Sequence, residues 1–316
     1  MHVRVIGGGV SGLTCGVELL RSGHDVSLWA SDFTPHTTSD AAAAVWYPYK
    51  AYPIDRVARW GAHAYRVFTH LAEIPASGVR VMPLTELRTE PSDDPWWASA
   101  VAGFRHAHAD ELPPGYADGY CFAAPVMDMS VYLPYVHHTF LSVGGTLAKR
   151  SVTDVGEAAV GADVVVNCTG LGSRELFGDQ DIHAARGQVV RVRNPGVRQV
   201  TLDDDGPAKV AYIVPRMHDV VLGGVDQEQD ERLAVDEDQT ADIIRRCALL
   251  DPRIAAIEPQ DIVSVAVGLR PVRSAVRLEV EVRDGMSVVH NYGHGGAGVT
   301  LSWGCARDVC DLIDQL

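Results

Sequence analysis

The first thirty residues limit the fold more than any other part of the sequence. An apolar run at 3–6 is followed by Gly7, Gly9 and Gly12 in the spacing G-x-G-x-x-G, and then by apolar residues at helical spacing through 13–20. In such a turn the glycines make the bend, let a pyrophosphate approach the backbone, and let the helix pack on the strand. The unpaired N–H groups at the helix start attract phosphate oxygens. The segment predicts a dinucleotide site; a glycine-rich turn without a ligand is the alternative.

The acidic residue that follows the second strand could have either of two roles. An acidic residue that binds a ribose hydroxyl is expected about twenty positions after the glycines. The apolar strand "DVSLW" (25–29) leads to Ser31 and Asp32, and Asp32 comes slightly late. A ribose contact and a solvated turn residue therefore both stay open for Asp32.

Residues 31–49 continue toward the same ligand. Hydroxyl groups occur at 37–39, and a run of small side chains follows at 40–44. A chain of this kind can pass along phosphates and then under a flat ring. An ordinary loop followed by a short alanine-rich helix gives the same pattern.

Composition and charge exclude several classes of partner. A chain of 316 residues favours two domains that share a cleft. The chain has 27 Lys and Arg against 41 Asp and Glu, a net charge of −14, which repels nucleic acid and anionic lipid surfaces. No leader-like segment or membrane-length apolar run is present, and the six cysteines form no CxxC pair. We expect a cytoplasmic protein with free thiols that binds no metal, nucleic acid or membrane.

A second glycine-rich segment lies near the C-terminus. The stretch "HNYGHGGAGVT" (290–300) contains four glycines. Apolar residues from Val299 through Trp303 to Ile313 then share one face of a closing helix. Glycines before a helix let its backbone lie against a planar ring, whereas a plain turn between a strand and a terminal helix is the simpler explanation.

The start of the chain resembles the flavin-binding start of the D-amino-acid oxidases. Four further segments carry the resemblance in the same order: "VVNCTG" (165–170), "ARGQVVRV" (185–192), "GLRPVR" (268–273) and "HNYGHGGAGVTLSWGCA" (290–306). The match extends from residue 1 to residue 316 and is thinnest between about 60 and 125. It implies FAD as the cofactor.

The resemblance also implies which residues contact FAD. Val152 would touch the adenosine through its backbone, Thr169 would lie near the phosphates, and Thr300 near the carbonyl edge of the ring. The first N–H groups of the closing helix would face the pyrimidine side of the isoalloxazine, where a reduced flavin is negative, and favour reduction by about 0.3–2 kcal/mol. The full set of implied contacts is Gly7, Gly8, Gly9, Val10, Ser11, Gly12, Ser31, Asp32, Thr37, Thr38, Ser39, Ala43, Ala44, Val45, Val152, Thr169, Arg270, His294, Gly295, Gly296, Ala297, Gly298, Val299 and Thr300.

The same resemblance implies which residues bind the substrate. Arginine suits a buried carboxylate because its planar fork donates two charge-assisted hydrogen bonds. Arg270 matches the carboxylate clamp of the family, and Arg273 is expected to be a surface or structural residue. Tyr212, in "VAYIV" (210–214), matches the carboxylate-binding tyrosine, and the carbonyl of Gly296 would meet the amine. A strand tyrosine with its hydroxyl in water is the alternative for Tyr212.

The sequence departs from the family at its lid. Vertebrate members carry a second tyrosine four residues before the carboxylate-binding one; Ala208 stands there in this chain, and segment 198–212 is short for a full lid. We therefore do not expect lid opening to limit turnover. No histidine, glutamate or lysine falls where a general base would have to lie. The resemblance implies direct hydride transfer from the substrate Cα to flavin N5.

The flavin motifs occupy three separated parts of the chain. We expect an α/β fold in which a Rossmann-like FAD-binding domain (1–50, 125–185 and 264–316) is interleaved with an α+β substrate-binding domain (51–124 and 186–263). The sheet of the second domain is expected to be mainly antiparallel, because its strands look linked by hairpins.

Three polar stretches are expected at the surface. His106 and His108 could hint at a metal but are interpreted as residues of a solvated strand or loop. The acidic run 226–239 is interpreted as a surface loop that leads into a helix, and Arg216 and His218 as turn residues.

The combined prediction is an FAD-dependent D-amino-acid oxidase that takes neutral or basic D-amino acids and dioxygen. It would produce a 2-oxo acid, ammonia and hydrogen peroxide. A D-aspartate oxidase is an alternative, which would need a further cation for the second carboxylate. A catalytically silent flavin-binding protein is the non-enzymatic alternative. A homodimer is compatible with the sequence, which does not fix the preferred substrate side chain.

Overall fold

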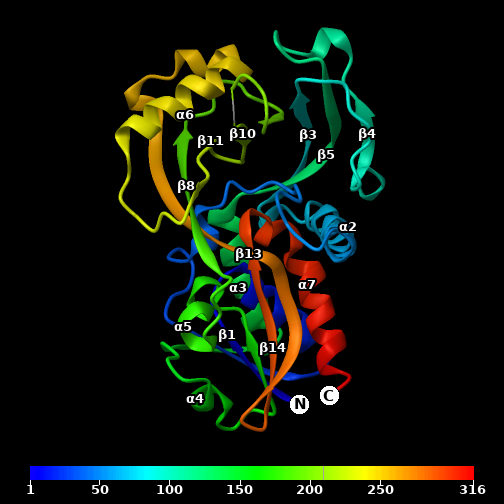
Figure 1. The fold of residues 1–316 in the computed structure, drawn as a ribbon, viewed down its shortest axis with the longest axis vertical. Coiled ribbons are helices and arrows are strands. Elements are labelled where there is room, and N and C mark those ends of the chain that lie inside the picture. The colour runs from blue at the N-terminus through cyan, green and yellow to red at the C-terminus, as the bar shows by residue number, and fades with distance from the viewer. Residues whose placement is uncertain (209) are drawn as a thin grey trace.

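The computed structural model describes residues 1–208 and 210–316 and shows two lobes that share one sheet (Figure 1). The strands are β1 His2–Ile6, β2 Asp25–Ala30, β3 Val79–Arg88, β4 Ala102–His106, β5 Asp118–Met127, β6 Thr146–Lys149, β7 Val164–Asn167, β8 His183–Val192, β9 Val200–Asp203, β10 Ala211–Pro215, β11 Val220–Gly223, β12 Gln227–Glu228, β13 Ile262–Arg283 and β14 Met286–His294. The helices are α1 Val10–Arg21, α2 Ile54–Leu71, α3 Met129–Ser142, α4 Val155–Ala159, α5 Ser173–Phe177, α6 Glu237–Leu250 and α7 Gly298–Ile313.

The sheet changes character along its length. Its strand order is β4-β5-β3-β9-β10-β11-β8-β13-β14-β7-β1-β2-β6, with β12 paired to β8. Strands β14, β7, β1, β2 and β6 run parallel to one another. The remaining pairs are antiparallel, except for the parallel pair β3–β9. The predicted α/β class, with a parallel nucleotide-type part and a mainly antiparallel part, is confirmed.

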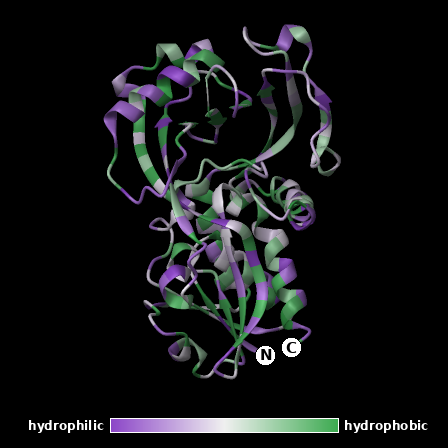
Figure 2. Cartoon of the chain, viewed as in Figure 1, coloured by the Kyte–Doolittle hydropathy of each residue, from purple (hydrophilic) through white to green (hydrophobic). Residues whose placement is uncertain are grey.

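Helices cover the parallel end of the sheet because its strands are buried on both faces. All four residues of β7 are buried, and so are four of the five in β1. Helix α1 packs against α3 and α7, and α7 packs against α2. Figure 2 shows the strands at the centre of this lobe coloured as hydrophobic. Both chain termini lie at the far end of the same lobe (Figure 1).

The closing helix is buried more completely than its sequence pattern predicts. Val299, Trp303 and Ile313 are buried, as expected, but Leu301 and Cys305 on other sides of α7 are buried as well. The reason is that α7 contacts α1, α2 and β14 together. A helix with neighbours on several sides needs more than one apolar face.

The other lobe confirms the predicted alternation of β10. Helix α6 packs on β8, β10 and β11, and Ala211 and Ile213 belong to the core under it. Tyr212 and Val214 belong to the core on the opposite face of the sheet. The predicted antiparallel hairpin β10–β11 is also present.

Strand β13 connects the two lobes. Its first part pairs with β8 and its last part with β14, and Val272 pairs with both His183 and His294 where the two pairings overlap. Residues 268–273 therefore lie at the junction between the antiparallel and parallel parts of the sheet.

The stretches expected at the surface differ in burial. His106 lies on strand β4, where Nδ1 is 2.9 Å from Asp118 Oδ1 and Nε2 is 3.0 Å from Asp94 Oδ1. Arg216 lies in the turn after β10, but its guanidinium is buried, and its Nε donates to Asp219 Oδ1 at 2.8 Å.

The six cysteines are free thiols. Among the described residues, no helix combines the length and the apolar character needed to cross a membrane.

Gly304 sets the distance between α2 and α7. A Cβ at Gly304 would lie 2.2 Å from the carbonyl oxygen of Trp60, whereas a Cβ at Gly61, on the facing helix, would meet Trp46 at 3.5 Å. We expect Gly304→Ala to lower the free energy of unfolding by about 1–3 kcal/mol, because the backbones must separate. Gly61→Ala is the matched control, and we expect it to be neutral or to stabilise by about 1 kcal/mol through helix propensity. Urea unfolding measures both, and equal stability of the two variants would contradict this packing argument.

Candidate functional site

A cavity of about 600 Å³ extends from the turn between β1 and α1 to strands β9 and β10. It brings together both ends of the chain and the middle segments that carry the sequence motifs. The predicted residues that line it are Gly7, Gly8, Gly9, Val10, Ser11, Ser31, Asp32, Thr37, Thr38, Ser39, Ala43, Ala44, Val45, Val152, Thr169, Tyr212, Arg270, His294, Gly295, Gly296, Gly298, Val299 and Thr300. Two predicted contacts, Gly12 and Ala297, are not part of the lining.

The two exceptions have structural reasons. A Cβ at Gly12 would lie 1.9 Å from the carbonyl oxygen of Gly7, so Gly12 lets α1 pack on the preceding turn. Ala297 is fully buried at the start of α7. The packing role predicted for the third glycine is thus supported, while a direct contact with the ligand is not.

The β1–α1 turn forms a glycine cradle, in which a side chain at Gly7 or Gly8 would not fit. Gly7 has a φ of +119°, and a Cβ there would lie 2.3 Å from the carbonyl oxygen of Cys168. A Cβ at Gly8 would lie 2.4 Å from the carbonyl oxygen of Asp32. The N-cap residue Gly9 is extended and has no side chain to cap α1, and the first turn of α1 has no acidic residue. Backbone N–H groups and the positive helix end therefore face the cavity, as a pyrophosphate requires.

The segment after β2 is a single tight turn followed by an extended chain. The Thr37 backbone N–H and hydroxyl both donate to Asp40 Oδ2, at 2.8 and 2.7 Å. This closes a 3₁₀ turn over Thr38–Ala41, and Ala42 is already extended. The Ser39 hydroxyl accepts the N–H of Val10 at 3.0 Å. The alternative of an alanine-rich helix is wrong, because the turn ends at Ala41 and Ala42–Ala44 pass along the cavity as an extended chain.

Residues predicted to contact the adenosine and phosphates of FAD lie at one end of the cavity. Asp32 lines it and also forms an exposed ion pair with Lys149 at 3.3 Å, so a ribose contact and a solvated role both stay open. Val152 lines the cavity on the chain after β6. The Thr169 hydroxyl donates to Asn167 Oδ1 at 2.7 Å, which fixes the loop after β7.

The start of α7 lies at the opposite end. The Thr300 hydroxyl donates to the carbonyl of Tyr47 at 3.0 Å and ties α7 to the segment after the alanine run. His294 is buried, its Nε2 lies 3.0 Å from Asn291 Oδ1, and burial lowers its pKa to about 4. It is therefore a neutral hydrogen-bonding group at ordinary pH. Gly296 lines the cavity beside Tyr49 and Arg270.

Arg270 projects from β13 across neighbouring glycine backbone. A Cβ at Gly187, on the paired strand β8, would lie 2.6 Å from Arg270 Nη2, so glycine makes room for the guanidinium. Its Nη1 donates to the carbonyl of Val225 at 3.0 Å and lies 3.5 Å from Asp226 Oδ1. The side chain is 21% exposed. The cation is thus held in place while it remains open to the cavity.

Tyr212 lies beside Arg270 on the same wall of the cavity. Its ring covers Gly223 of the paired strand, where a Cβ would lie 2.0 Å from Tyr212 Cζ. Burial raises the pKa of Tyr212, and the positive charge of Arg270 opposes this rise. The phenol therefore stays neutral and can donate a hydrogen bond. Tyr212 on β10 and Arg270 on β13 are separated by β11 and β8, but their side chains line the same cavity. A tyrosine and an arginine together are the groups that a carboxylate needs.

Three functional neighbours of Arg270 were missed by the sequence analysis. The Tyr49 hydroxyl and Lys50 Nζ both donate to Asp226 Oδ2, at 3.1 and 2.8 Å. Burial would raise the pKa of Asp226, but Lys50 and Arg270 outweigh it and lower that pKa. The prediction that 226–239 is an acidic surface loop is therefore wrong at its first residue. The sequence signal for Tyr49 and Lys50 is the position of "YPYK" (47–50), which follows the alanine run after Val45 and Trp46.

An acidic end closes the cavity beyond Tyr212. Asp204 lines the wall after β9, and burial raises its pKa to about 6. Glu86 of β3 lies behind Tyr47, is 3% exposed, and has a pKa raised by burial to about 7. Among the described residues, Glu86 Oε2 has no hydrogen-bond partner. Sequence reasoning missed this end because Glu86 belongs to the part of the chain where the resemblance is thinnest.

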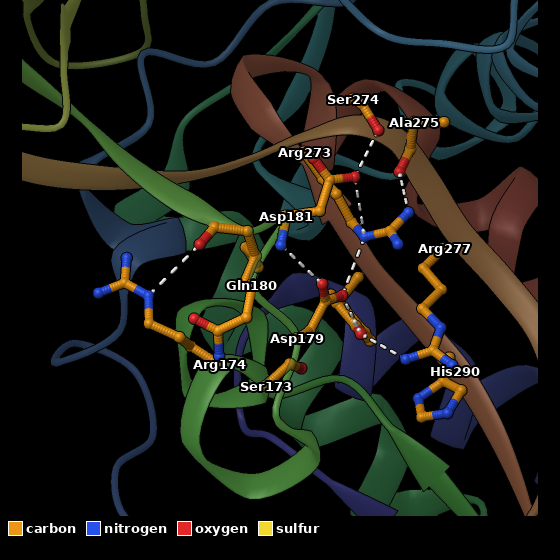
Figure 3. Close-up of polar contacts among 12 residues, drawn as sticks. Ser173, Arg174, Asp179, Gln180, Asp181, Arg273, Ser274, Ala275, Arg277 and His290 are labelled. Carbon is orange, nitrogen blue, oxygen red and sulfur yellow. Dashed lines mark hydrogen bonds and ion pairs between the residues drawn. The ribbon is translucent and has the colours of Figure 1, made fainter.

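Arg273 has a structural role, as expected. Figure 3 shows its side chain directed toward Asp179 and Asp181. Its Nε donates to Asp179 Oδ2 at 2.9 Å, and the Tyr292 hydroxyl donates to the same oxygen at 2.6 Å. The arginine thus ties β13 to the loop after α5, outside the cavity lining.

Taken together, the glycine cradle, the open helix end and the arginine beside a tyrosine define a dinucleotide-dependent enzyme that acts on a carboxylate. The family described as "FAD dependent oxidoreductase" matches residues 2–312, and the chain belongs to this family. The cradle and the small-residue segment fit FAD, because Gly7 and Gly8 let the turn pack closely against the backbone at Cys168 and Asp32, and the turn itself lines the cavity without side chains.

Individual relatives agree with this assignment. A D-amino-acid oxidase from Rubrobacter xylanophilus is 46% identical over 98% of this chain and 94% of its own length. The human D-aspartate oxidase is 34% identical over 99% of this chain and 95% of its own length. Among solved structures, a glycine oxidase from Geobacillus kaustophilus superposes with a TM-score of 0.80 at 19% identity, covering 99% of this chain and 94% of that one. This last likeness supports the fold.

The raised pKa of Glu86 predicts a pH-dependent stability. The folded pKa is about 7 against an ordinary value of 4.5, so between these values the folded protein keeps a proton that the unfolded chain has lost. Stability must therefore fall as pH rises from about 4.5 to 7, by up to about 3 kcal/mol. We expect Glu86→Gln to remove this contribution.

Urea unfolding at pH 5 and pH 8 tests this expectation. Stability of the Glu86→Gln variant should change less between the two pH values than that of the parent protein, and the exposed Glu90→Gln variant should follow the parent. The same pH dependence in all three proteins would show that Glu86 ionises normally.

Proposed function

We propose that this protein is an FAD-dependent oxidase of neutral or basic D-amino acids. The overall reaction converts a D-amino acid, dioxygen and water into a 2-oxo acid, ammonia and hydrogen peroxide. The flavin supplies the oxidising centre, which accepts two electrons from the substrate Cα–H bond. The observation that carries the proposal is that Arg270 and Tyr212 line the same cavity as the glycine cradle and the start of α7.

The chain's own residues bind and orient the substrate. Arg270 would hold the α-carboxylate with two charge-assisted hydrogen bonds, and the neutral hydroxyl of Tyr212 would add a third. The carbonyl of Gly296 would accept from the amine. With three points fixed, the Cα–H bond is presented in one direction, which lowers the barrier through orientation and not through a general base. Asp226 positions Arg270 from the other side at 3.5 Å.

The cofactor contacts are part of the same proposal. The β1–α1 turn would hold the pyrophosphate, 37–45 and the first residues of α7 would enclose the ring, and Val152 would meet the adenosine. The contributing segments support the division into an FAD-binding domain (1–50, 125–185 and 264–316) and a substrate-binding domain between them. Free thiols support a cytoplasmic location, and a homodimer remains a prediction.

A D-aspartate oxidase is the weaker alternative. It would need a second cation for the side-chain carboxylate, and the nearby cations are engaged. Arg216 is buried against Asp219, and Lys50 is paired with Asp226. The relative named D-aspartate oxidase is also less similar than the D-amino-acid oxidase from Rubrobacter, at 34% against 46% identity.

A substrate panel tests the proposed activity. We expect hydrogen peroxide and bleaching of the flavin absorbance under anaerobic conditions with D-alanine, but not with L-alanine. Activity confined to D-aspartate would favour the alternative enzyme. No bleaching with any amino acid would favour a silent flavin-binding protein, and a purified protein that takes up no FAD would contradict both.

Substitution of Arg270 tests the carboxylate site. Arg270→Ala removes a charge-assisted pair, and we expect kcat/KM for D-alanine to fall by about 10²-fold or more while the flavin stays bound. Tyr212→Phe keeps the ring over Gly223 and should cost about tenfold or less. The exposed Arg245→Ala variant, on α6, serves as the control. Loss of flavin together with activity in Arg270→Ala would show that Arg270 holds the cofactor instead.

A further inference from the structure

One row of side chains crosses the sheet from the carboxylate site to the acidic end. Tyr212 of β10 pairs with Leu202 of β9, and Leu202 pairs with Glu86 of β3. Paired residues on neighbouring strands point to the same face of a sheet, and neighbouring strands lie about 5 Å apart. Glu86 is therefore about 10 Å from Tyr212 along this face. Asp204 follows Leu202 by two residues, lines the cavity and lies closer.

The charges around this end are mostly negative. Asp204 interacts with Asp205 and Asp203, while Lys50 and Arg88 are the cations that oppose them. Both cations already have acidic partners: Lys50 lies 2.8 Å from Asp226, and Arg88 Nη1 is shared between Glu86 at 3.4 Å and Asp205 at 3.3 Å. The acidic end of the cavity thus has more carboxylates than cations around it.

The carboxylate of Glu86 independently indicates that a hydrogen-bond donor binds at the acidic end of the cavity. Its side chain is 3% exposed, and within residues 1–208 and 210–316 its Oε2 accepts no hydrogen bond. A buried carboxylate oxygen without a donor is costly, so such atoms usually serve a ligand or hold a proton. Burial keeps the pKa of Glu86 near 7, and a neighbouring cation would lower it.

We propose that Asp204, supported by Glu86 behind Tyr47, binds the positive end of the substrate side chain, so that D-arginine and D-lysine are preferred over neutral D-amino acids of equal length. This inference rests on the proposed function. With the α-carboxylate on Arg270 and Tyr212, a long side chain directed along the sheet row would reach Asp204 after β9, whereas Glu86 lies behind Tyr47 and outside the cavity lining. An acidic side chain in the same place would meet Asp204 and be rejected.

The preference can be measured with isosteric substrates. D-citrulline has the shape of D-arginine without its charge, and D-2-aminoheptanoic acid has the length of D-lysine with a methyl group in place of the ammonium group. We expect kcat/KM to be about tenfold higher for each cationic substrate than for its neutral counterpart, as one hydrogen-bonded charge pair provides. Bleaching with D-alanine is measured in parallel. Absence of D-alanine oxidation would refute the proposed function, whereas oxidation of D-alanine without any cationic preference would refute this inference alone.

Substitutions test which residue produces the preference for cationic substrates. Asp204→Asn should lower kcat/KM for D-arginine about tenfold and leave the value for D-citrulline nearly unchanged. Asp205→Asn is the matched control, because its side chain is 68% exposed and lies outside the cavity lining; it should change neither substrate. Glu86→Gln should weaken the preference less than Asp204→Asn does. The flavin spectrum reports whether each variant is folded, and an equal loss for both substrates in Asp204→Asn would overturn the assignment.

Discussion

The position of Arg270 depends on a single strand that belongs to both parts of the sheet. Strand β13 pairs with antiparallel β8 before it pairs with β14, which is itself parallel to β7. Arg270 lies opposite Ala185 in the first pairing, just before Val272, where both pairings meet. A substrate bound by this side chain must lie beside the cofactor end of the cavity. Backbone hydrogen bonds between strands thus set the place at which Arg270 enters the cavity.

Glycine at close backbone contacts makes this arrangement possible. The Arg270 guanidinium occupies the space that a Cβ at Gly187 would fill, and the Tyr212 ring does the same at Gly223. Both glycines lie on strands paired with the strand that carries the larger residue. The side chains of Arg270 and Tyr212 can therefore lie close over the sheet, where both line the cavity. Asp226 completes the arrangement, since it holds Arg270 from the rim with a charge already shared with Lys50.

The sequence predicts the parts of this site that are local in the chain. The β1–α1 turn, the hydroxyl and alanine segment, and the start of α7 each read as contiguous motifs, and nearly all of their residues line the cavity. Asp226 and Glu86 could not be found in this way. Their roles arise from pairings of β3 with β9 and from a loop that returns to Tyr49, contacts between residues more than a hundred positions apart. Periodicity and spacing do not encode such contacts.

The run Asp203, Asp204 and Asp205 shows how strand alternation gives one residue type three roles. Asp203 faces away from the cavity, where its carboxylate accepts from the Tyr116 hydroxyl at 2.5 Å and from the N–H of Ala208 at 3.0 Å. These bonds tie the segment after β9 to Tyr116. Asp204 points the opposite way, into the cavity. Asp205 is exposed and meets Arg88. Because alternate residues face opposite sides of a strand, the Asp203 carboxylate is directed to one face of the sheet and the Asp204 carboxylate to the face that lines the cavity.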